Sequence, residues 1–479
     1  MKAFQVNNLK SFVNSGCVEI KPITIFIGKN SSGKSSLVRF PIVLKQTIEE
    51  SISPLLFYGK HIDYGNYEDV IFNHKEEENL AFTLKLNLDG IKRGIRHGPF
   101  VGGEKEVLNF IGCNENEENE LSLNIEIGRQ ITNQRFLGDL EVKSYVLKVN
   151  EKDLINVKKH NEKYITYIKG EHRAELDFEF NGVSPILITN TLLLKKMGEE
   201  DPESNEVRYI LSLFRAVELY LSAIVANISY IGPFRRTPDR NYRYQEANRL
   251  NIGSDGSYTS ELLASYHRKN DVRFFKKLNN WLESHLSIHI EVEDLKGGMY
   301  RIVVKDLETG VKNNIIDVGF GLSQVLPIIV QVLNQGSDRR MKTDIVSRRI
   351  ERHIKKINIV EQPELHLHPN AQSNLADLFI MGTKSNPRNC FLVETHSEHL
   401  ILRLRRRILE GKIEPENVAI YYVERDTDTQ EGSKVKKLSL DSQGNIKDWP
   451  VDFFDQDYKE IMQINKLKSQ LDTGDQEEW

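Results

Sequence analysis

The sequence predicts an α/β protein built around a phosphate-binding loop, with β-rich and helical segments inserted between the two halves of the fold. An apolar strand at residues 23–27 leads into the pattern G-x-x-x-x-G-K-S at residues 28–35, and helical periodicity follows to about residue 50. Two further apolar strands end near Glu361 and His396. Strands that alternate with helices in this way favour a parallel sheet with a binding site at the carboxyl ends of its strands.

The composition is that of a soluble globular protein. The chain has 479 residues, of which 39% are hydrophobic and 28% charged, and this length indicates two or three domains. The net charge of −4 means that any binding of nucleic acid must come from a local basic patch. The three cysteines show no C-x-x-C spacing, so neither a zinc ribbon nor a disulfide framework is indicated. We expect a cytoplasmic protein.

No membrane association is expected either. The first residues lack the basic and apolar regions of a secretory signal. The longest uncharged apolar run, residues 219–234, contains Gly232-Pro233 and is shorter than the roughly 20 residues that span a bilayer.

The phosphate-binding loop supplies the first half of the expected site. Its two glycines allow a tight turn, so that backbone N–H groups and the positive end of the next helix point at a bound phosphate. Lys34 is expected to bridge the β- and γ-phosphates of ATP, and the Ser35 hydroxyl to take one position around Mg²⁺. The residues expected to contact the nucleotide are Gly28, Asn30, Ser31, Ser32, Gly33, Lys34, Ser35 and Ser36.

Residues 357–396 supply the second half. An apolar strand that ends in an acid is the Walker B design, which makes Glu361 the expected Mg²⁺-side carboxylate. The strand at residues 391–394 leads to His396, which is placed to sense the γ-phosphate. Upstream, the turn G-F-G-L-S-Q at residues 319–324 opens an apolar helix, and a helix N-terminus with a hydroxyl group is an anion site. Ser323 and Gln324 are the nucleotide contacts expected there.

The intervening segments have less specific patterns. Apolar residues alternate at residues 80–88 and 121–127, which predicts half-buried strands, and the sequence stays strand-like and polar to about residue 190. Residues 206–228 predict a long helix that either packs on its own domain or forms a dimer.

A segment rich in arginine and aromatic residues follows that helix. This composition suits a surface that grips phosphates and stacks bases, but also a loop that forms salt bridges with its neighbours. If the segment binds nucleic acid, the expected contacts are Arg235, Arg236, Arg240 and Arg243.

The order of these motifs resembles that of ABC-type ATPases of the SMC and OLD kind. More narrowly, the chain resembles the stand-alone AAA ATPase proteins of bacterial anti-phage defence systems such as Septu, PARIS and retron-linked modules. The resemblance is dense at residues 1–73 and 314–400 and rests on the phosphate-binding loop, the signature-like turn, the segment E-Q-P-E-L-H-L-H-P and the Thr-His-Ser segment.

The resemblance implies a P-loop NTPase whose nucleotide-binding domain is split by inserted arms. Its two cofactors would be ATP and Mg²⁺. Its composite sites would each join the P-loop of one subunit to the signature turn of another, in a homodimer or higher oligomer. Its output would be control of a separate effector, a nuclease or a toxin. The corresponding parts are an N-terminal lobe at residues 1–90, a β-rich insertion at 91–200, a helical and Arg/aromatic insertion at 201–313, a C-terminal lobe at 314–430, and a hairpin and tail at 431–479.

The sequence departs from the family pattern at two places. Gln362 stands where most relatives have a catalytic glutamate, and an amide can orient water but cannot act as a general base. Hydrolysis is therefore expected to be slow, or to be supported by Glu364 or His396. The usual L-S-G-G-Q signature is also degraded, and we select Ser323 as the residue that meets the γ-phosphate of the partner.

Two rival functions remain at this stage. A self-contained nuclease of the OLD kind would need a Toprim domain, and the acids Glu424, Asp426 and Asp428 offer only a superficial cluster with too little chain after it. A DNA-end or repair clamp would use the arginine segment. Zinc binding by His366, His368, His396 and His399 is a weaker reading than their placement around the nucleotide site.

Overall fold

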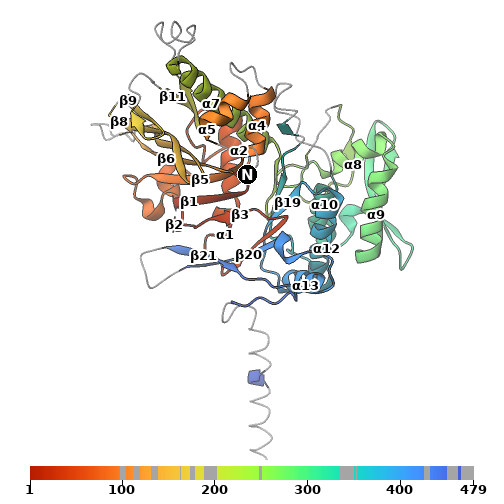
Figure 1. Ribbon diagram of the computed structural model, residues 1–479. Helices are drawn as coiled ribbons and strands as arrows, with labels where there is room; N and C mark the ends of the chain where they lie inside the picture. The colour runs from red at the N-terminus through yellow and green to blue at the C-terminus, as the bar shows by residue number, and fades with distance from the viewer. Residues whose placement is uncertain are drawn as a thin grey trace, which may run out of the picture.

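A computed structural model describes residues 1–97, 104–112, 119–130, 139–161, 163–172, 178–187, 202–246, 251–334, 350–351, 353–425, 432–449 and 462–464. Two sheets dominate these residues, and a smaller sheet with its own helices lies to one side (Figure 1).

The first sheet carries the candidate site. Its strand order is β13-β18-β19-β4-β20-β21, and all neighbours pair in parallel except β20 and β21, which form an antiparallel hairpin. Strand β4, which leads into the phosphate-binding loop, lies between β19 and β20 and is buried along its whole length. The bounds are β13 Ile228–Ile231, β18 Lys356–Glu361, β19 Asn389–Glu394, β4 Ile23–Gly28, β20 Val418–Arg425 and β21 Ser433–Leu438.

This sheet confirms the three predicted strands of the site, β4, β18 and β19, and adds β13, β20 and β21. Strand β13 lies inside the segment predicted as a helical insertion, but it pairs with β18 as the edge of the parallel sheet. This strand has only four residues, and so short an apolar run cannot be distinguished in the sequence from the end of the apolar helix before it.

Helices cover both faces of this sheet. The side chains of Ile23, Ile25 and Ile27 pack against helices α10, α12 and α13, whereas Phe26 lies in the other core, with the helices that follow the loop. The bounds are α10 Phe320–Leu333, α12 Pro369–Ser385 and α13 Glu398–Leu409. A doubly covered parallel sheet explains why its strands read as continuous apolar runs.

The helix after the phosphate-binding loop is broken, not continuous as predicted. Helix α1 spans Lys34–Val38, helix α2 spans Phe40–Glu50, and Arg39 forms the junction between them. Pro41 lies in the first turn of α2, and because it has no N–H group it cannot continue the hydrogen-bond ladder of α1. The break places the Arg39 side chain beside the ends of the parallel strands.

The second sheet is antiparallel, with the order β10-β9-β8-β7-β6-β5-β1-β2, and β3 also pairs with β1. The predicted alternation at residues 80–88 and 121–127 is confirmed, since the apolar residues of β5 and β6 in these ranges are buried. The bounds are β1 Ala3–Leu9, β2 Phe12–Asn14, β3 Val18–Glu19, β5 Leu80–Asn87, β6 Glu120–Arg129, β7 Leu140–Val149, β8 Lys152–His160, β9 Lys163–Ile168 and β10 Glu171–His172.

The strands predicted as an inserted arm are therefore continuous with the N-terminal strands. Strand β6 pairs with β5 over eight residue pairs, so that one buried row crosses the predicted boundary at residue 90. Two helices that the strand-like pattern missed precede β6: α4, Leu88–His97, and α5, Glu104–Ile111. Shorter elements beside this sheet are α3 Tyr67–Val70, β11 Phe178–Asn181 and β12 Ser184–Leu187.

Helix α7, Pro202–Ala226, packs on its own domain. It contacts α2, α4 and α5, which confirms the packing interpretation of the long predicted helix (Figure 1). Its segment Asn205–Ala226 is apolar and long enough to cross a membrane, but 72% of the most apolar window is buried within the structure, as in the core helix of a globular protein.

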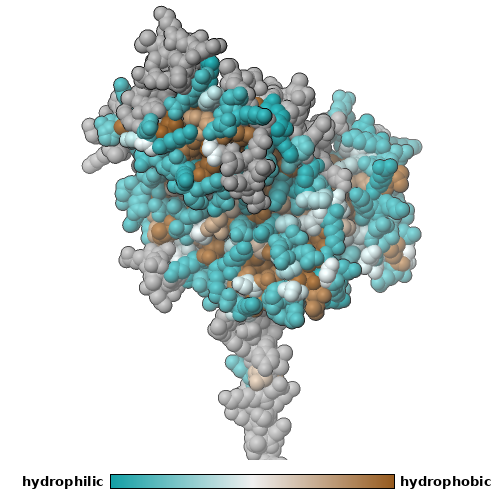
Figure 2. Space-filling model, in the orientation of Figure 1, coloured by the Kyte–Doolittle hydropathy of each residue, from teal (hydrophilic) through white to brown (hydrophobic). Residues whose placement is uncertain are grey.

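The remaining segment forms a small sheet in the order β14-β16-β15, with β17 also on β16, backed by α8 and α9. The bounds are α8 Thr259–Arg268, α9 Val272–Leu286, β14 Tyr242–Arg243, β15 Ile288–Leu295, β16 Met299–Asp306 and β17 Lys312–Asn314. Figure 2 shows one face of the whole molecule, on which hydrophilic residues predominate and hydrophobic residues form small separate areas.

Candidate nucleotide-binding site

The backbone of the phosphate-binding loop requires its two glycines. Gly28 has φ 145°, and a Cβ atom there would lie 2.0 Å from the carbonyl oxygen of Val423. Gly33 has φ 96°, and a Cβ atom there would lie 2.2 Å from the Ser11 hydroxyl. A side chain at Gly28 would collide with the backbone of β20, and one at Gly33 would collide with the side chains of Ser11 and Phe12, so the tight turn predicted between β4 and α1 requires both glycines.

Lys34 occupies the position expected of the phosphate-binding lysine. Its ammonium group donates hydrogen bonds to the carbonyl oxygens of Gly28 (2.9 Å) and Lys29 (2.7 Å), which holds it over the loop. Burial lowers the pKa of Lys34, although the carboxylates of Glu394 and Glu364 oppose this shift. The Ser32 hydroxyl, buried in the same loop, has no hydrogen-bond partner among the described residues.

Ser35 is paired with an acid that the sequence did not single out. Its hydroxyl donates a hydrogen bond to Glu394 Oε1 at 2.8 Å, at the end of β19. The side chain of Glu394 is buried, and no described residue bonds its Oε2 atom. Burial and the neighbouring charge of Glu361 raise the pKa of Glu394 to about 7. The acid at the end of an apolar strand was a usable signal, since the same pattern identified Glu361.

Glu361, the predicted Mg²⁺-side acid, forms an ion pair instead. Arg39 Nε donates to its Oε1 at 2.6 Å and Arg39 Nη2 to its Oε2 at 2.5 Å. Only 1% of the Glu361 side chain is exposed, against 27% of Arg39. Burial by itself lowers the pKa of Arg39, but the hydrogen bond to Glu361 and the negative charge of that residue outweigh burial, so the pKa of Arg39 is raised. Both carboxylate oxygens of Glu361 therefore accept a hydrogen bond from the positively charged Arg39 guanidinium.

Gln362 begins a strained turn after β18. Its φ is 43°, in the left-handed region that few residues other than glycine adopt. Its N–H donates to the Glu394 carbonyl at 2.8 Å, and Arg235 donates to the carbonyls of Glu361 (2.5 Å) and Gln362 (3.3 Å). Hydrogen bonds from two directions thus hold the strained conformation.

Glu364 holds the segment that carries His396. Its carboxylate accepts hydrogen bonds from the Thr395 hydroxyl (2.8 Å) and the His396 N–H (2.6 Å). Burial raises the pKa of Glu364, although these hydrogen bonds oppose the shift. Burial and the charge of Lys34 lower the pKa of His396, so its ring is neutral at pH 7. Glu364 orients the predicted sensor.

The sequence matches the family described as "AAA ATPase domain" over residues 1–401. The chain belongs to the AAA ATPase domain family. A second match, to a protein of unknown function (DUF3696), covers residues 413–464. The family and the P-loop sheet together show a mixed α/β ATPase domain that binds ATP. No curated protein matches the sequence.

Several solved structures of SMC heads align with the ATPase domain at low identity. An Smc head bound to the C-terminal winged-helix domain of ScpA shares 12% identity, with 92% of this chain and 98% of that chain covered and a TM-score of 0.40. An Smc head bound to the C-terminal domain of ScpA, derived from Pyrococcus furiosus, shares 11%, with coverages of 91% and 96% and a TM-score of 0.39. The SMC head domain from Thermotoga maritima shares 11%, with coverages of 92% and 99% and a TM-score of 0.38.

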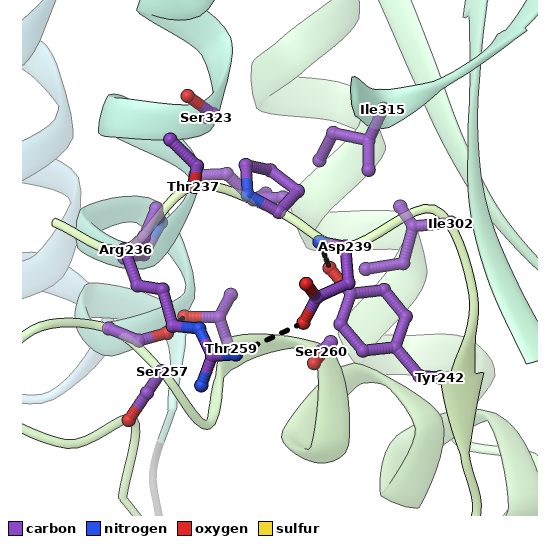
Figure 3. Close-up of a pocket in the computed structure, with 14 residues that line it drawn as sticks. Arg236, Thr237, Asp239, Tyr242, Ser257, Thr259, Ser260, Ile302, Ile315 and Ser323 are labelled. Carbon is purple, nitrogen blue, oxygen red and sulfur yellow. Dashed lines mark hydrogen bonds and ion pairs between the residues drawn. The ribbon is translucent and has the colours of Figure 1, made fainter. Parts of the chain in front are cut away.

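Within the single chain, Ser323 of the signature-like turn is buried, and its role toward a partner stays a prediction. The side chain is 6% exposed, one turn inside α10, and its hydroxyl donates to the Phe320 carbonyl at 2.6 Å. It lines a pocket beside Thr237, Tyr242 and Pro327, which Figure 3 shows with Ser323 on the α10 side. Gln324 is buried as well, with its amide 3.5 Å from the Arg235 carbonyl. The helix start is instead exposed at Phe320.

The predicted nucleic-acid residues have different environments. Arg235 is 6% exposed and bonds the turn after β18, so it does not belong to a surface patch; burial lowers its pKa to about 10. Arg236 pairs with Asp239 at 3.4 Å, and Arg240 pairs with Asp317 at 2.6 Å. Arg243 is exposed on β14. The two ion pairs agree with the interpretation of this segment as a loop that forms salt bridges with its neighbours. A nucleic-acid role for the exposed Arg236, Arg240 and Arg243 stays a prediction.

The rival metal readings gain nothing from the geometry. Among the described residues, no group of three or more His, Cys, Asp and Glu side chains is arranged to hold a metal. His366 packs edge-on against the Phe320 ring, with 4.9 Å between centroids. Asp426 and Asp428 of the suggested Toprim cluster lie outside the described residues.

Proposed function

We propose that this protein is a slow ATPase that assembles through its nucleotide sites and controls a separate effector, a nuclease or a toxin, in anti-phage defence. The loop N–H groups and Lys34 bind the phosphates of ATP. Ser35 and a neighbouring strand-end carboxylate hold Mg²⁺, which supplies charge neutralisation at the phosphates. The residues present fit a cation, because a buried carboxylate oxygen of Glu394 beside Ser35 has no partner among the described residues.

The observation that carries slow hydrolysis is that the acids in and directly after β18 and β19 are held by other groups. Glu361 is paired with Arg39, and Glu364 is bonded to Thr395 and His396. Glu394 accepts from Ser35, and Gln362 is an amide. An attacking water can be oriented by Gln362 and the neutral His396, but Glu361 and Glu364 are engaged and, in this proposal, the second oxygen of Glu394 faces the cation, so none of the three is free to take the proton. A long-lived ATP-bound state follows from this arrangement.

Exposed apolar side chains near the start of α10 favour assembly with a second copy. Phe234 is 86% exposed, Phe320 48% and Ile316 43%. Aromatic side chains exposed together beside a binding site are typical of surfaces that bind another protein. In a head-to-tail dimer this surface would face the nucleotide of the partner, as in the family that the motifs resemble.

The effector and the defence role rest on the resemblance of the motif order to defence ATPases. Two states of the assembly, closed with ATP and open after hydrolysis, would give an effector two differently presented surfaces. Co-purification of the full chain with the product of its neighbouring gene, with and without ATP, tests this part.

The nucleotide proposal is tested by Lys34→Ala. The affinity for a fluorescent ATP analogue should fall on the order of a hundredfold, because a charge-assisted phosphate contact is lost. The matched control is Lys296→Ala, which removes an exposed lysine from the turn between β15 and β16. Unchanged affinity in folded Lys34→Ala protein would contradict the assignment.

Assembly is tested separately by light scattering. The wild-type mass should rise to that of a dimer or larger oligomer with saturating ATP, and Lys34→Ala should stay at the ATP-free mass. An ATP-independent mass in the wild type would remove the composite-site proposal but not nucleotide binding.

A further inference from the structure

We infer that the acid that faces the divalent cation beside the P-loop is Glu394, and that Glu361, the Walker B acid, is instead half of a structural ion pair with Arg39. The inference rests on the proposed binding of ATP with a divalent cation, and it concerns which side chain of this chain serves that cation.

Glu394 is hydrogen-bonded to Ser35, the serine of the P-loop. The hydroxyl that takes a metal position in P-loop proteins is bonded to Glu394 at 2.8 Å. The other carboxylate oxygen is buried and lacks a partner among the described residues, and a buried carboxylate oxygen without a hydrogen bond is costly. Hard divalent cations prefer such oxygen atoms. A cation beside Ser35 would give the second carboxylate oxygen of Glu394 the partner that it lacks among the described residues.

The Glu361 carboxylate already has a positively charged partner. Two hydrogen bonds from Arg39 engage both of its oxygens in a bidentate pair, the strong form of arginine-carboxylate contact. Arg235 bonds the Glu361 carbonyl at 2.5 Å, which fixes the end of the strand. A cation at Glu361 would have to share the carboxylate with the partly buried Arg39 guanidinium, and the two positive charges would repel each other.

The strand order places β19, and not β18, next to β4. Glu394 pairs in register with Phe26 of β4, the strand that leads into the loop, whereas Glu361 pairs with Glu394. Adjacent strands are about 4.8 Å apart, so Glu361 lies one strand farther from the loop. The two acids occupy equivalent positions in sequence pattern, but only Glu394 is on the strand next to the P-loop.

The test is the dependence of nucleotide binding on the metal in full-length Glu394→Gln and Glu361→Gln proteins. The affinity for the ATP analogue is measured with excess Mg²⁺ and with EDTA, and Mn²⁺ binding to the nucleotide complex is measured by electron paramagnetic resonance. Glu394→Gln should lower the Mn²⁺ affinity by about 10- to 100-fold and abolish the Mg²⁺-dependent gain in ATP affinity. Glu361→Gln, an equally isosteric change one strand away, should keep both.

The reverse pattern would overturn the inference, and so would loss of metal dependence in both variants or in neither. A wild type whose nucleotide affinity is the same with Mg²⁺ and EDTA would overturn it as well. Failure of the proposed function itself looks different, because wild type and Lys34→Ala would then bind the ATP analogue equally weakly under every condition. Binding in EDTA serves as the folding control, since both variants should retain the wild-type metal-free affinity.

Discussion

Strands β18 and β19 are adjacent in the parallel sheet, and each is an apolar run that ends in a glutamate at the same register position. Their acids nevertheless have different partners. Glu361 binds Arg39 through both oxygens, whereas Glu394 receives one bond from Ser35 and has one unpartnered oxygen within the described structure. The acid at the end of β18 has a cationic partner for both oxygens, and in our inference the acid at the end of β19 faces the divalent cation.

The comparison teaches that an acid at the end of an apolar strand does not by itself identify a metal site. In our inference, a free oxygen and a hydrogen bond to the Ser35 hydroxyl distinguish the acid that faces the cation, and both depend on neighbours from other parts of the chain. Burial acts on the two acids alike, so the difference comes from the arginine that one of them has and the other lacks.

The largest expected effect is the contribution of Glu394 to the pH dependence of stability. Because the pKa of Glu394 is raised from 4.5 to about 7, the folded protein binds more protons than the unfolded chain in this range. The free energy of unfolding therefore falls as pH rises from 4.5 through 7, by about 3 kcal/mol for this group. Glu394→Gln should lack this fall in urea titrations with EDTA present.

The difference between the two proteins is the quantity to compare, since all other titrating groups cancel. Wild-type and Glu394→Gln stabilities that run parallel from pH 5 to pH 8 would show that Glu394 titrates normally. Excess Mg²⁺ and ATP should remove the difference, because a bound cation favours the charged carboxylate.

The next effect concerns turnover at the end of β18. Gln362→Glu adds a carboxylate directly after β18, where Glu361 is paired with Arg39, and general-base assistance is commonly worth about a hundredfold in rate, or about 2.7 kcal/mol. Steady-state phosphate release should rise accordingly, and the ATP-bound assembly should have a shorter lifetime.

The competing account gives Glu364 the role of base. In that case Gln362→Glu changes little and Glu364→Gln abolishes turnover. The bonds of Glu364 to Thr395 and His396 favour a positioning role, so we expect Glu364→Gln to lower turnover through a misplaced His396 and to weaken ATP affinity as well. A fast wild-type rate, undiminished in Glu364→Gln, would contradict both accounts.

The smallest effect is the stability of the ion pair. Glu361→Gln should destabilise the fold by about 2 kcal/mol, below the 3–5 kcal/mol of fully buried pairs because Arg39 is 27% exposed. The double variant Arg39→Gln/Glu361→Gln should recover part of this loss in urea unfolding, since it leaves no unpaired charge. Additive losses would show that the pair is not coupled, and the contrast between the two strand ends would weaken.

The sequence by itself determined the elements whose causes are local. Gly28 and Gly33 specify the turn of the loop, because the backbone there adopts conformations and close approaches that exclude a side chain. Alternation in β5 and β6 predicted their buried faces, and the motif order predicted the ATPase family that the match over residues 1–401 confirms. The nucleotide contacts of the individual loop residues stay predictions.

Only the tertiary structure decided which charges meet. Ser35 and Glu394 are 359 residues apart, and Arg39 and Glu361 are 322 apart. Strand order and the break at Pro41 bring them together, and neither follows from local pattern. Arg235 shows the same dependence. The composition of its segment suggested an exposed surface, but the fold buries Arg235 against the turn after β18. Electrostatic roles depend on distance and burial, and the order of residues along the chain contains these quantities only through the complete fold.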